Sequence, residues 1–148
     1  MNITIHEGIL TPEIFVGLRN ACEMPPVDLG MVERAVKSSF VTLCAVSGNR
    51  TVGMVRLVGD GAFVFVIVDL LVVPQWRHMG IGSKLVKEAM ARARAAVPPD
   101  RSAVVSLFSV EGRESFYSRL GFIELPAVGL GAGMQHYLYP QNVDMGKI

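Results

Sequence analysis

Apolar positions in the first 40 residues recur first with a strand period and then with a helix period. Residues 2–7 alternate apolar and polar side chains and predict a short strand. Thr11, followed by a proline and an acid, predicts the N-cap of a helix that continues to about Cys22. Asp28 can cap a second helix, in which apolar side chains recur at helical spacing up to Phe40. Two helices are therefore expected before the main sheet.

The middle of the chain changes from β-branched runs to an amphipathic helix. Residues 40–46 and 51–58 predict a hairpin, and residues 62–73 predict a long buried strand. A helix with an apolar face begins at Ile81 and ends before Pro98. Three aromatic residues are expected in the core: Phe63, Phe65 and Phe108.

The last third of the chain predicts further short elements. They are a strand over 103–108, a helix over 111–120 stopped by Gly121, a strand over 122–125 and a last strand over 136–139. The predicted order is strand, helix, helix, three strands, helix, strand, helix and two strands. This order indicates a mixed α/β fold in one domain over 1–148, with a frayed tail over 140–148.

Composition supports a compact, ordered domain. The 148 residues are 51% hydrophobic and 18% charged, which excludes a disordered regulator. The most apolar stretch, residues 62–73, is interrupted by Asp69 and is too short to span a membrane. The N-terminus does not resemble a signal peptide, and two isolated cysteines, Cys22 and Cys44, suit a reducing compartment, so we expect a cytoplasmic protein.

Charge is nearly balanced overall but uneven along the chain. The net charge of +1 is too small for a typical nucleic-acid binder. Residues 49–97 hold seven basic and three acidic side chains, a local charge of +4. Lys84, Lys87 and Arg92 contribute to this excess, and they could serve either a phosphate-bearing ligand or an ordinary solvated helix face.

The junction between the buried strand and the amphipathic helix has the features of an anion site. Gly80 and Gly82 lack Cβ atoms and would let a ligand approach the backbone. The first N–H groups of a helix have no intrahelical acceptor, and the helix dipole favours negative charge there. The turn matches neither GxxxxGK[ST] nor GxGxxG, because Leu85 occupies the place of the third glycine.

The segment instead resembles motif A of the GCN5-related N-acetyltransferases (GNAT), with Arg77, Gly80 and Gly82 at the motif positions. Residues 69–74 are similar to the fourth strand of that family, and residues 116–122, Phe-Tyr-Ser-Arg-Leu-Gly-Phe, are similar to its late motif. The element order predicted above is also the order of the family. The resemblance therefore covers nearly the whole chain and implies the GNAT fold, which has a central mixed, mostly antiparallel sheet flanked by helices.

The resemblance implies acetyl-CoA as co-substrate, without a metal. It implies that main-chain groups of Leu70 and Val72 pair with the pantetheine arm. It also implies that main-chain N–H groups of the turn hold the diphosphate, contributed by Arg77, His78, Met79, Gly80, Ile81, Gly82 and Ser83. The three histidines lie in different predicted elements without ligand spacing, so we expect no metal site.

Tyr117 is the candidate catalytic residue. Attack of an amine on the thioester releases a thiolate, and a phenol with a pKa of about 10 can donate a hydrogen bond or proton to that sulfur. The family uses the corresponding tyrosine in this way in many members. The alternative is a half-buried aromatic residue that only packs.

The general base remains unassigned. Some family members carry an acid or histidine on the fourth strand, where this chain has Val66 and Val68, and Val110 replaces an asparagine that often contacts pantetheine. Strict strand alternation would point Asp69 to the opposite face from its neighbours. Two alternatives therefore stay open: a noncatalytic acyl-CoA-binding module, and a phosphate-binding fold unrelated to CoA.

The acceptor is expected to be a small-molecule amine, with neither nucleic acid nor a membrane as partner, and a homodimer stays open. Three of the five acidic residues in the first 40, Glu23, Asp28 and Glu33, suggest a cationic acceptor such as a polyamine. Solvated helix faces explain these carboxylates equally well.

Overall fold

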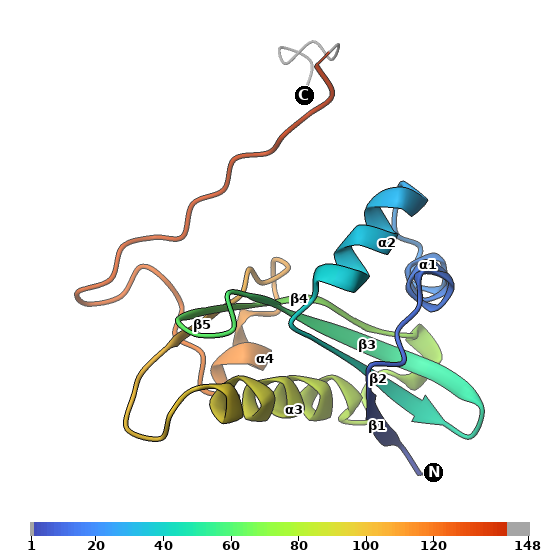
Figure 1. The fold of residues 1–148 in the computed structure, drawn as a ribbon, viewed down its shortest axis with the longest axis horizontal. Helices are drawn as coiled ribbons and strands as arrows, with labels where there is room; N and C mark the ends of the chain where they lie inside the picture. The colour runs from blue at the N-terminus through green and yellow to red at the C-terminus, as the bar shows by residue number, and fades with distance from the viewer. Residues whose placement is uncertain (1, 142–148) are drawn as a thin grey trace. The chain divides into compact units, whose positions relative to one another are not determined.

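The computed structural model describes residues 2–141. It divides into two compact units, the first ending at Val110 and the second beginning at Glu111 (Figure 1). The single domain expected over 1–148 therefore stays a prediction. Of the tail predicted over 140–148, all but the first two residues lie outside the described part of the chain.

The first unit contains nearly all of the regular structure. Its elements are β1 (Thr4–Glu7), α1 (Pro12–Ala21), α2 (Leu29–Ser38), β2 (Val41–Ser47), β3 (Arg50–Gly59), β4 (Val64–Val72), the 3₁₀ turn η1 (Pro74–Trp76), α3 (Ile81–Ala96) and β5 (Val104–Ser106). The predicted caps are confirmed: the Thr11 hydroxyl accepts from Ile14 N–H, and the Asp28 carboxylate accepts from Met31 N–H.

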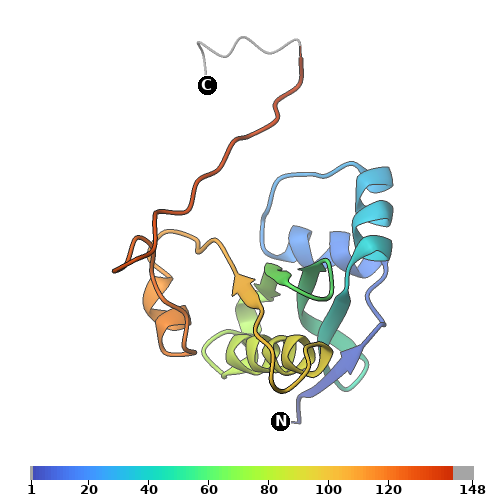
Figure 2. The ribbon, with the colours of Figure 1, turned by 60° about the vertical axis from the view of Figure 1, so that its left-hand side comes forward.

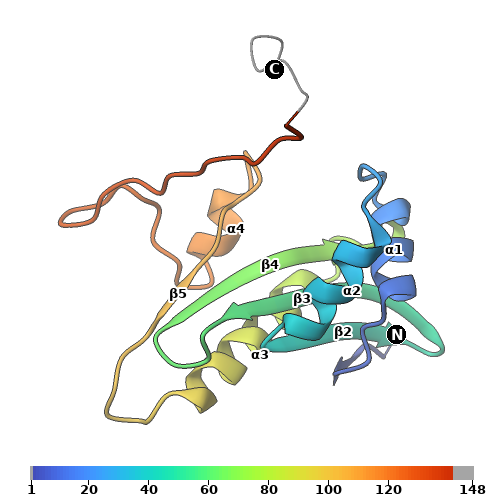
Figure 3. The same ribbon diagram turned by 45° about the horizontal axis from the view of Figure 1, so that its top comes forward.

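One sheet organises this unit in the order β1-β2-β3-β4-β5. Neighbouring strands from β1 to β4 are antiparallel, and β5 is parallel to β4, joined to it through α3. Strand β5 pairs only with the beginning of β4, from Val64 to Val66 (Figure 3). The mixed, mostly antiparallel sheet predicted from the sequence is confirmed.

Helices cover both faces of the sheet (Figures 1 and 2). Helix α3 packs against β2, β3 and β4 with a buried stripe formed by Ile81, Leu85, Val86, Ala89 and Ala93. Helices α1 and α2 cover the other face over a buried cluster formed by Leu10, Phe15, Leu18, Val32, Cys44, Met54 and Val73. These two apolar layers fix the position of β4 between the helices.

The expected aromatic core is only partly correct. Phe65 is fully buried, whereas Phe63 is 72% exposed and Phe108 is 57% exposed. Phe63 lies in the turn before β4, and Phe108 follows the short strand β5, so both side chains fall outside the layers covered by the helices. Their positions at the strand ends explain why hydrophobicity alone misplaced them.

The second unit contains one short helix, α4 (Glu114–Ser118). Gly121 terminates it with a φ of 96°, and Phe122 N–H bonds back to the Tyr117 carbonyl. The strands predicted over 122–125 and 136–139 are wrong, because neither range pairs with a strand within residues 2–141. Alternating side chains give these ranges β-propensity, but a strand also needs a ladder partner, and Pro126 directly follows the first range.

No helix in the described chain is long and apolar enough to cross a membrane.

Candidate active site

Strand β4 has a free edge where its partner β5 ends. Beyond Val66, no strand of the described chain pairs with the side of β4 that faces away from β3. Val73 N–H donates to Val52 O on β3 at 2.9 Å, so the backbone of Val73 points toward β3. Because successive residues of a strand direct their main-chain groups to opposite edges, those of Val72 and Leu70 point to the free edge. These are the two positions expected to pair with pantetheine.

The Val72 carbonyl on this edge already has polar neighbours. Arg77 Nε donates to it at 2.9 Å, and the Cys22 thiol lies 3.6 Å away as a second donor. The Arg77 main-chain N–H donates to Pro74 O at 3.3 Å within η1. Arg77 therefore makes hydrogen bonds at the end of β4 with both its side chain and its main chain. Its own N–H group is already used, so the N–H groups that could face a ligand are those of the residues after Arg77.

The turn after β4 adopts a backbone conformation that few side chains tolerate. His78 has a φ of 63° and Gly80 a φ of 79°, both in the left-handed region. Gly80 is the N-cap of α3, and no side chain caps the helix. A Cβ atom added to Gly80 would meet no atom within 4 Å, so the space over this residue is open.

The first turn of α3 presents main-chain donors to that open space. Lys84 N–H makes the first intrahelical bond, to Gly80 O at 3.1 Å, which leaves the N–H groups of Ile81, Gly82 and Ser83 without intrahelical acceptors. The Ile81 side chain is 2% exposed and anchors the turn to the core, whereas Met79 is half exposed. An uncapped helix start of this kind binds phosphate through its N–H groups and its dipole.

The basic side chains of α3 are largely engaged elsewhere. Lys84 Nζ donates to Ile3 O at 3.3 Å, and Arg92 pairs with Glu7 at 3.6 Å and with Glu88 at 3.2 Å. Two of the three cations considered for phosphate binding thus support the packing of β1 and α3. This arrangement favours main-chain donors over side-chain charge as the binding device at the turn.

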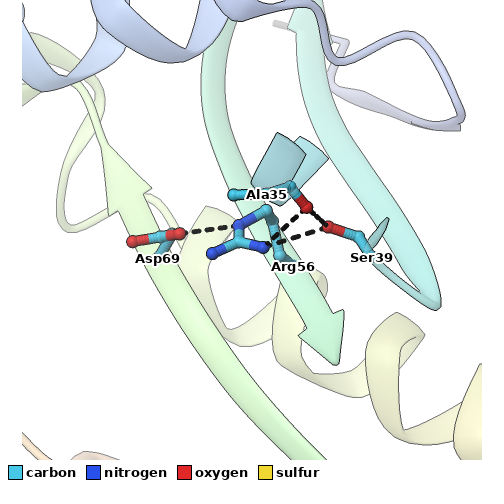
Figure 4. Close-up of polar contacts among 4 residues, drawn as sticks. All are labelled: Ala35, Ser39, Arg56 and Asp69. Atoms are coloured by element: carbon cyan, nitrogen blue, oxygen red, sulfur yellow. Dashed lines mark hydrogen bonds and ion pairs between the residues drawn. The ribbon is translucent and has the colours of Figure 1, made fainter. Parts of the chain in front are cut away.

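A β-bulge in β4 reorients Asp69 toward the face that carries α1 and α2. Met54 pairs with Leu71 and Arg56 with Val68, so β4 has one residue more than β3 across this step, and Asp69 adopts a φ of 54°. The Asp69 carboxylate accepts from Arg56 Nε at 2.7 Å (Figure 4). The orientation predicted from strict alternation is therefore wrong, because the extra residue interrupts the alternation.

Arg56 joins this bulge to the end of α2. Its Nη1 donates to Ala35 O at 3.1 Å and to Ser39 Oγ at 3.0 Å (Figure 4). The Arg56 and Asp69 side chains are 13% and 22% exposed, so the ion pair lies largely out of water. The pair fixes the β4 backbone immediately before Leu70. Sequence reasoning missed Arg56 because its partners are 13 to 21 residues away along the chain.

Tyr117 lies in α4, within the second unit. Its ring makes edge-to-face contacts with Phe116 and Phe122, at centroid distances of 4.9 Å and 6.1 Å. Burial raises the pKa of the Tyr117 phenol, and the positive charge of Arg113 opposes part of that effect. The hydroxyl therefore stays protonated at neutral pH, as a hydrogen-bond donor or acid requires.

Cys44 lies in the core, and the metal-ligating side chains of the described residues are dispersed. Cys44 is fully buried, and burial raises the pKa of its thiol to about 11. Among residues 2–141, no three His, Cys, Asp or Glu side chains lie close enough together to hold a metal ion.

Comparison with known proteins establishes the family. The sequence model of the acetyltransferase (GNAT) domain matches residues 38–124, and the chain belongs to this family. The matched range begins at the end of α2 and includes β4, the turn, α3 and α4.

Individual relatives support the same assignment. An acetyltransferase of the GNAT family from Streptococcus pneumoniae is 31% identical, with a TM-score of 0.79 over 94% of this chain and 100% of that structure. A protein of unknown function from meticillin-resistant Staphylococcus aureus, described as a probable acetyltransferase, is 25% identical, with a TM-score of 0.81 over 93% and 100%. An uncharacterized N-acetyltransferase, ycf52, of Porphyra purpurea is 28% identical over 102 residues. Those residues are 66% of this chain, and the chain spans 56% of that relative.

Proposed function

We propose that the protein transfers an acetyl group from acetyl-CoA to a primary amine of a small molecule. One observation carries this proposal: the free edge of β4 leads, through a turn with two left-handed residues, directly into the uncapped start of α3. Within one continuous segment, the main-chain groups of β4 could pair with the extended, amide-containing pantetheine arm. Those of the turn and the start of α3 could bind the diphosphate.

The donor-site residues fit acetyl-CoA by their backbone chemistry. The main-chain groups of Leu70 and the N–H of Val72 would hold the pantetheine arm at the edge of β4, because the Val72 carbonyl already accepts from Arg77 and Cys22. Main-chain N–H groups from His78 through Ser83, which include Met79, Gly80, Ile81 and Gly82, would hold the diphosphate. Arg77 would act through its hydrogen bond to Val72 O, by keeping the end of β4 in place. Acetyl-CoA, when bound, supplies the acetyl group as an activated thioester.

Tyr117 would hold a proton for the departing thiolate. Its raised pKa keeps the phenol protonated over the neutral range, and its two aromatic neighbours limit the orientations of the ring. Val66 and Val68 have no titratable atom and cannot act as the general base. Water or another group would therefore accept the proton of the amine.

A noncatalytic acyl-CoA-binding module is the second candidate. The observation in its favour is that the carboxylate of β4 on the α1 and α2 face, Asp69, already forms an ion pair with Arg56. Such a module would bind CoA through the same backbone groups without turning over an amine.

A panel of amines with acetyl-CoA and a readout for free thiol separates the two candidates. We expect at least one primary amine to accelerate thiol release well above the rate of acetyl-CoA hydrolysis, with mass spectrometry showing the N-acetyl product. CoA binding by calorimetry without release for any amine would favour the binding module. Absence of CoA binding would exclude both.

The cellular location stays a proposal. Cys22 and Cys44 are free thiols in the structure, which suits a reducing compartment, and we propose the cytoplasm. Fractionation of the source cells would test it, and recovery outside the cytoplasm would contradict it.

A further inference from the structure

Two guanidinium groups lie against one aromatic ring beneath α1. The Cζ atoms of Arg19 and Arg56 are each 5.9 Å from the centroid of the Phe15 ring, within the range of a cation–π contact. The two Cζ atoms are therefore no more than about 12 Å apart. Arg56 reaches the ring from the sheet, whereas Arg19 belongs to the same helix as Phe15.

Arg19 has a donor that the fold does not satisfy. Its Nη2 donates to Pro25 O at 3.0 Å, but its Nε is buried and has no hydrogen-bond partner within the described residues. A buried donor without a partner is costly, and native structures rarely keep one without a reason. The chemistry of the guanidinium suggests the reason, because Nε and a terminal nitrogen together form a fork that matches an oxyanion.

The charge around the ring has an excess of one positive group. Asp69 neutralises Arg56 through their ion pair. Arg19 forms no salt bridge within residues 2–141, so the cluster of Arg19, Arg56 and Asp69 carries a net charge of +1. An anionic group would balance this charge in a partly buried place, where charge-assisted hydrogen bonds are strong.

The cluster borders the predicted donor site. Phe15, Arg19 and Cys22 follow one another at i, i+4 and i+7, so they lie on one face of α1 and its C-cap. At one end of this face, Phe15 contacts Arg56, which holds Asp69 next to Leu70. At the other end, the Cys22 thiol reaches Val72 O. Arg19 lies between Phe15 and Cys22 along this face of α1.

We propose that the acceptor amine carries an oxyanion group, a carboxylate or a phosphate, and that Arg19 binds it through Nε and a terminal nitrogen. Arg56, whose charge Asp69 balances, also contacts the Phe15 ring, so Arg19 supplies the positive charge for the oxyanion. This inference rests on the proposed acetyl transfer and names its substrate class. It is an alternative to the cationic acceptor expected from the acidic N-terminal third, and the test below separates the two.

The first test uses pairs of amines that differ only in the oxyanion. Suitable pairs are an amino acid and its amide, and ethanolamine phosphate and ethanolamine, with spermidine as a cationic competitor. We expect the anionic member of at least one pair to have a kcat/KM about 10- to 100-fold higher, as a charge-assisted hydrogen bond contributes. The pair that shows the difference identifies carboxylate or phosphate.

The second test removes the charge of Arg19. In Arg19→Gln, the acceptor KM for the anionic amine should rise about 10- to 100-fold, while the KM for acetyl-CoA and the rate with its uncharged counterpart stay nearly unchanged. Arg34→Gln is the matched control, because Arg34 is an exposed arginine of α2. Arg19→Lys, which keeps the charge and loses the fork, should show an intermediate KM and keeps the test decisive if Arg19→Gln unfolds.

The outcomes separate this inference from the proposed function. Turnover that prefers uncharged amines or spermidine, or an Arg19→Gln variant with unchanged acceptor KM, would overturn the oxyanion and leave acetyl transfer in place. Equal losses in Arg34→Gln would also overturn it, because they would indicate general electrostatics. If no amine in the panel accelerated thiol release, the acetyl transfer itself would be overturned, and the acceptor inference with it.

Discussion

Replacement of Arg56 by methionine should destabilise the first unit strongly. The substitution keeps much of the side-chain volume but removes the hydrogen bonds to Asp69, Ala35 O and Ser39 Oγ. It also leaves the Asp69 carboxylate, which is 22% exposed, without a cation. Breaking a buried ion pair in this way costs 3–5 kcal/mol, and the partial exposure of Asp69 places the expected loss near the lower end, about 3 kcal/mol.

A double-mutant cycle isolates the cause. Arg56→Met with Asp69→Asn removes both charges, so the double variant should recover about 1 to 2 kcal/mol relative to the additive expectation. Arg101→Met is the control, because Arg101 pairs with Asp100 at 3.8 Å on the surface, with side chains 73% and 77% exposed, and such pairs contribute less than about 1 kcal/mol.

Urea unfolding followed by fluorescence and by circular dichroism gives the free energies and tests whether the two probes coincide. The account of the bulge would be wrong if Arg56→Met cost no more than Arg101→Met, or if the cycle showed no coupling.

Three further predictions concern Gly80 in the turn between β4 and α3, the phenol of Tyr117, and Asp60 in the turn between β3 and β4. In Gly80→Asn, the asparagine tolerates the left-handed backbone but its side chain fills the open space, so CoA binding measured by calorimetry should weaken by about tenfold or more. Gly48→Asn, at a φ of 58° in the β2–β3 turn, is the control and should leave CoA binding unchanged. Equal affinities for the two variants would contradict the site. Tyr117→Phe should lower kcat by about 10²- to 10⁴-fold with little change in CoA affinity. Because burial raises the pKa of Tyr117, the alkaline fall of kcat in the native enzyme should lie above pH 10 and disappear in the variant; a loss below about tenfold would remove Tyr117 as the acid. Asp60 accepts from the N–H groups of three following residues, which lowers its pKa, so its contribution to stability is present above its unfolded pKa of about 3.9 and is lost as pH falls through the folded value. Asp60→Asn should therefore be less stable than the native protein at pH 7 and nearly equal to it in strong acid, and a constant difference across pH would contradict the role of these bonds.

Local signals in the sequence predicted the elements that local physics determines. The caps at Thr11 and Asp28 and the apolar stripe that begins at Ile81 depend on neighbours within one or two helical turns, and all three are confirmed. The strands expected over 122–125 and 136–139 depend on a partner strand, which local propensity does not specify, and they do not form.

The parts of the site that depend on tertiary register could not be predicted. The bulge at Asp69 arises from the pairing of β3 with β4, so the alternation rule gave the wrong face for its side chain. Arg56 joins elements that are far apart in sequence, and the unsatisfied Nε of Arg19 becomes visible only once α1 is packed on the sheet. By contrast, the sequence predicted an accessible backbone at Gly80, and a Cβ atom added there would meet no atom within 4 Å.

The most direct test of the donor site is a titration of the native protein with CoA followed by residue-resolved amide NMR and hydrogen exchange. We predict the largest shift changes and the strongest new protection at the N–H groups of residues 80–83, with a second set at Leu70 and Val72. Changes confined to the exposed basic face of α3, around Lys87, or spread evenly without protection at Gly82 and Ser83, would contradict the assignment of this strand, turn and helix as the acetyl-CoA site.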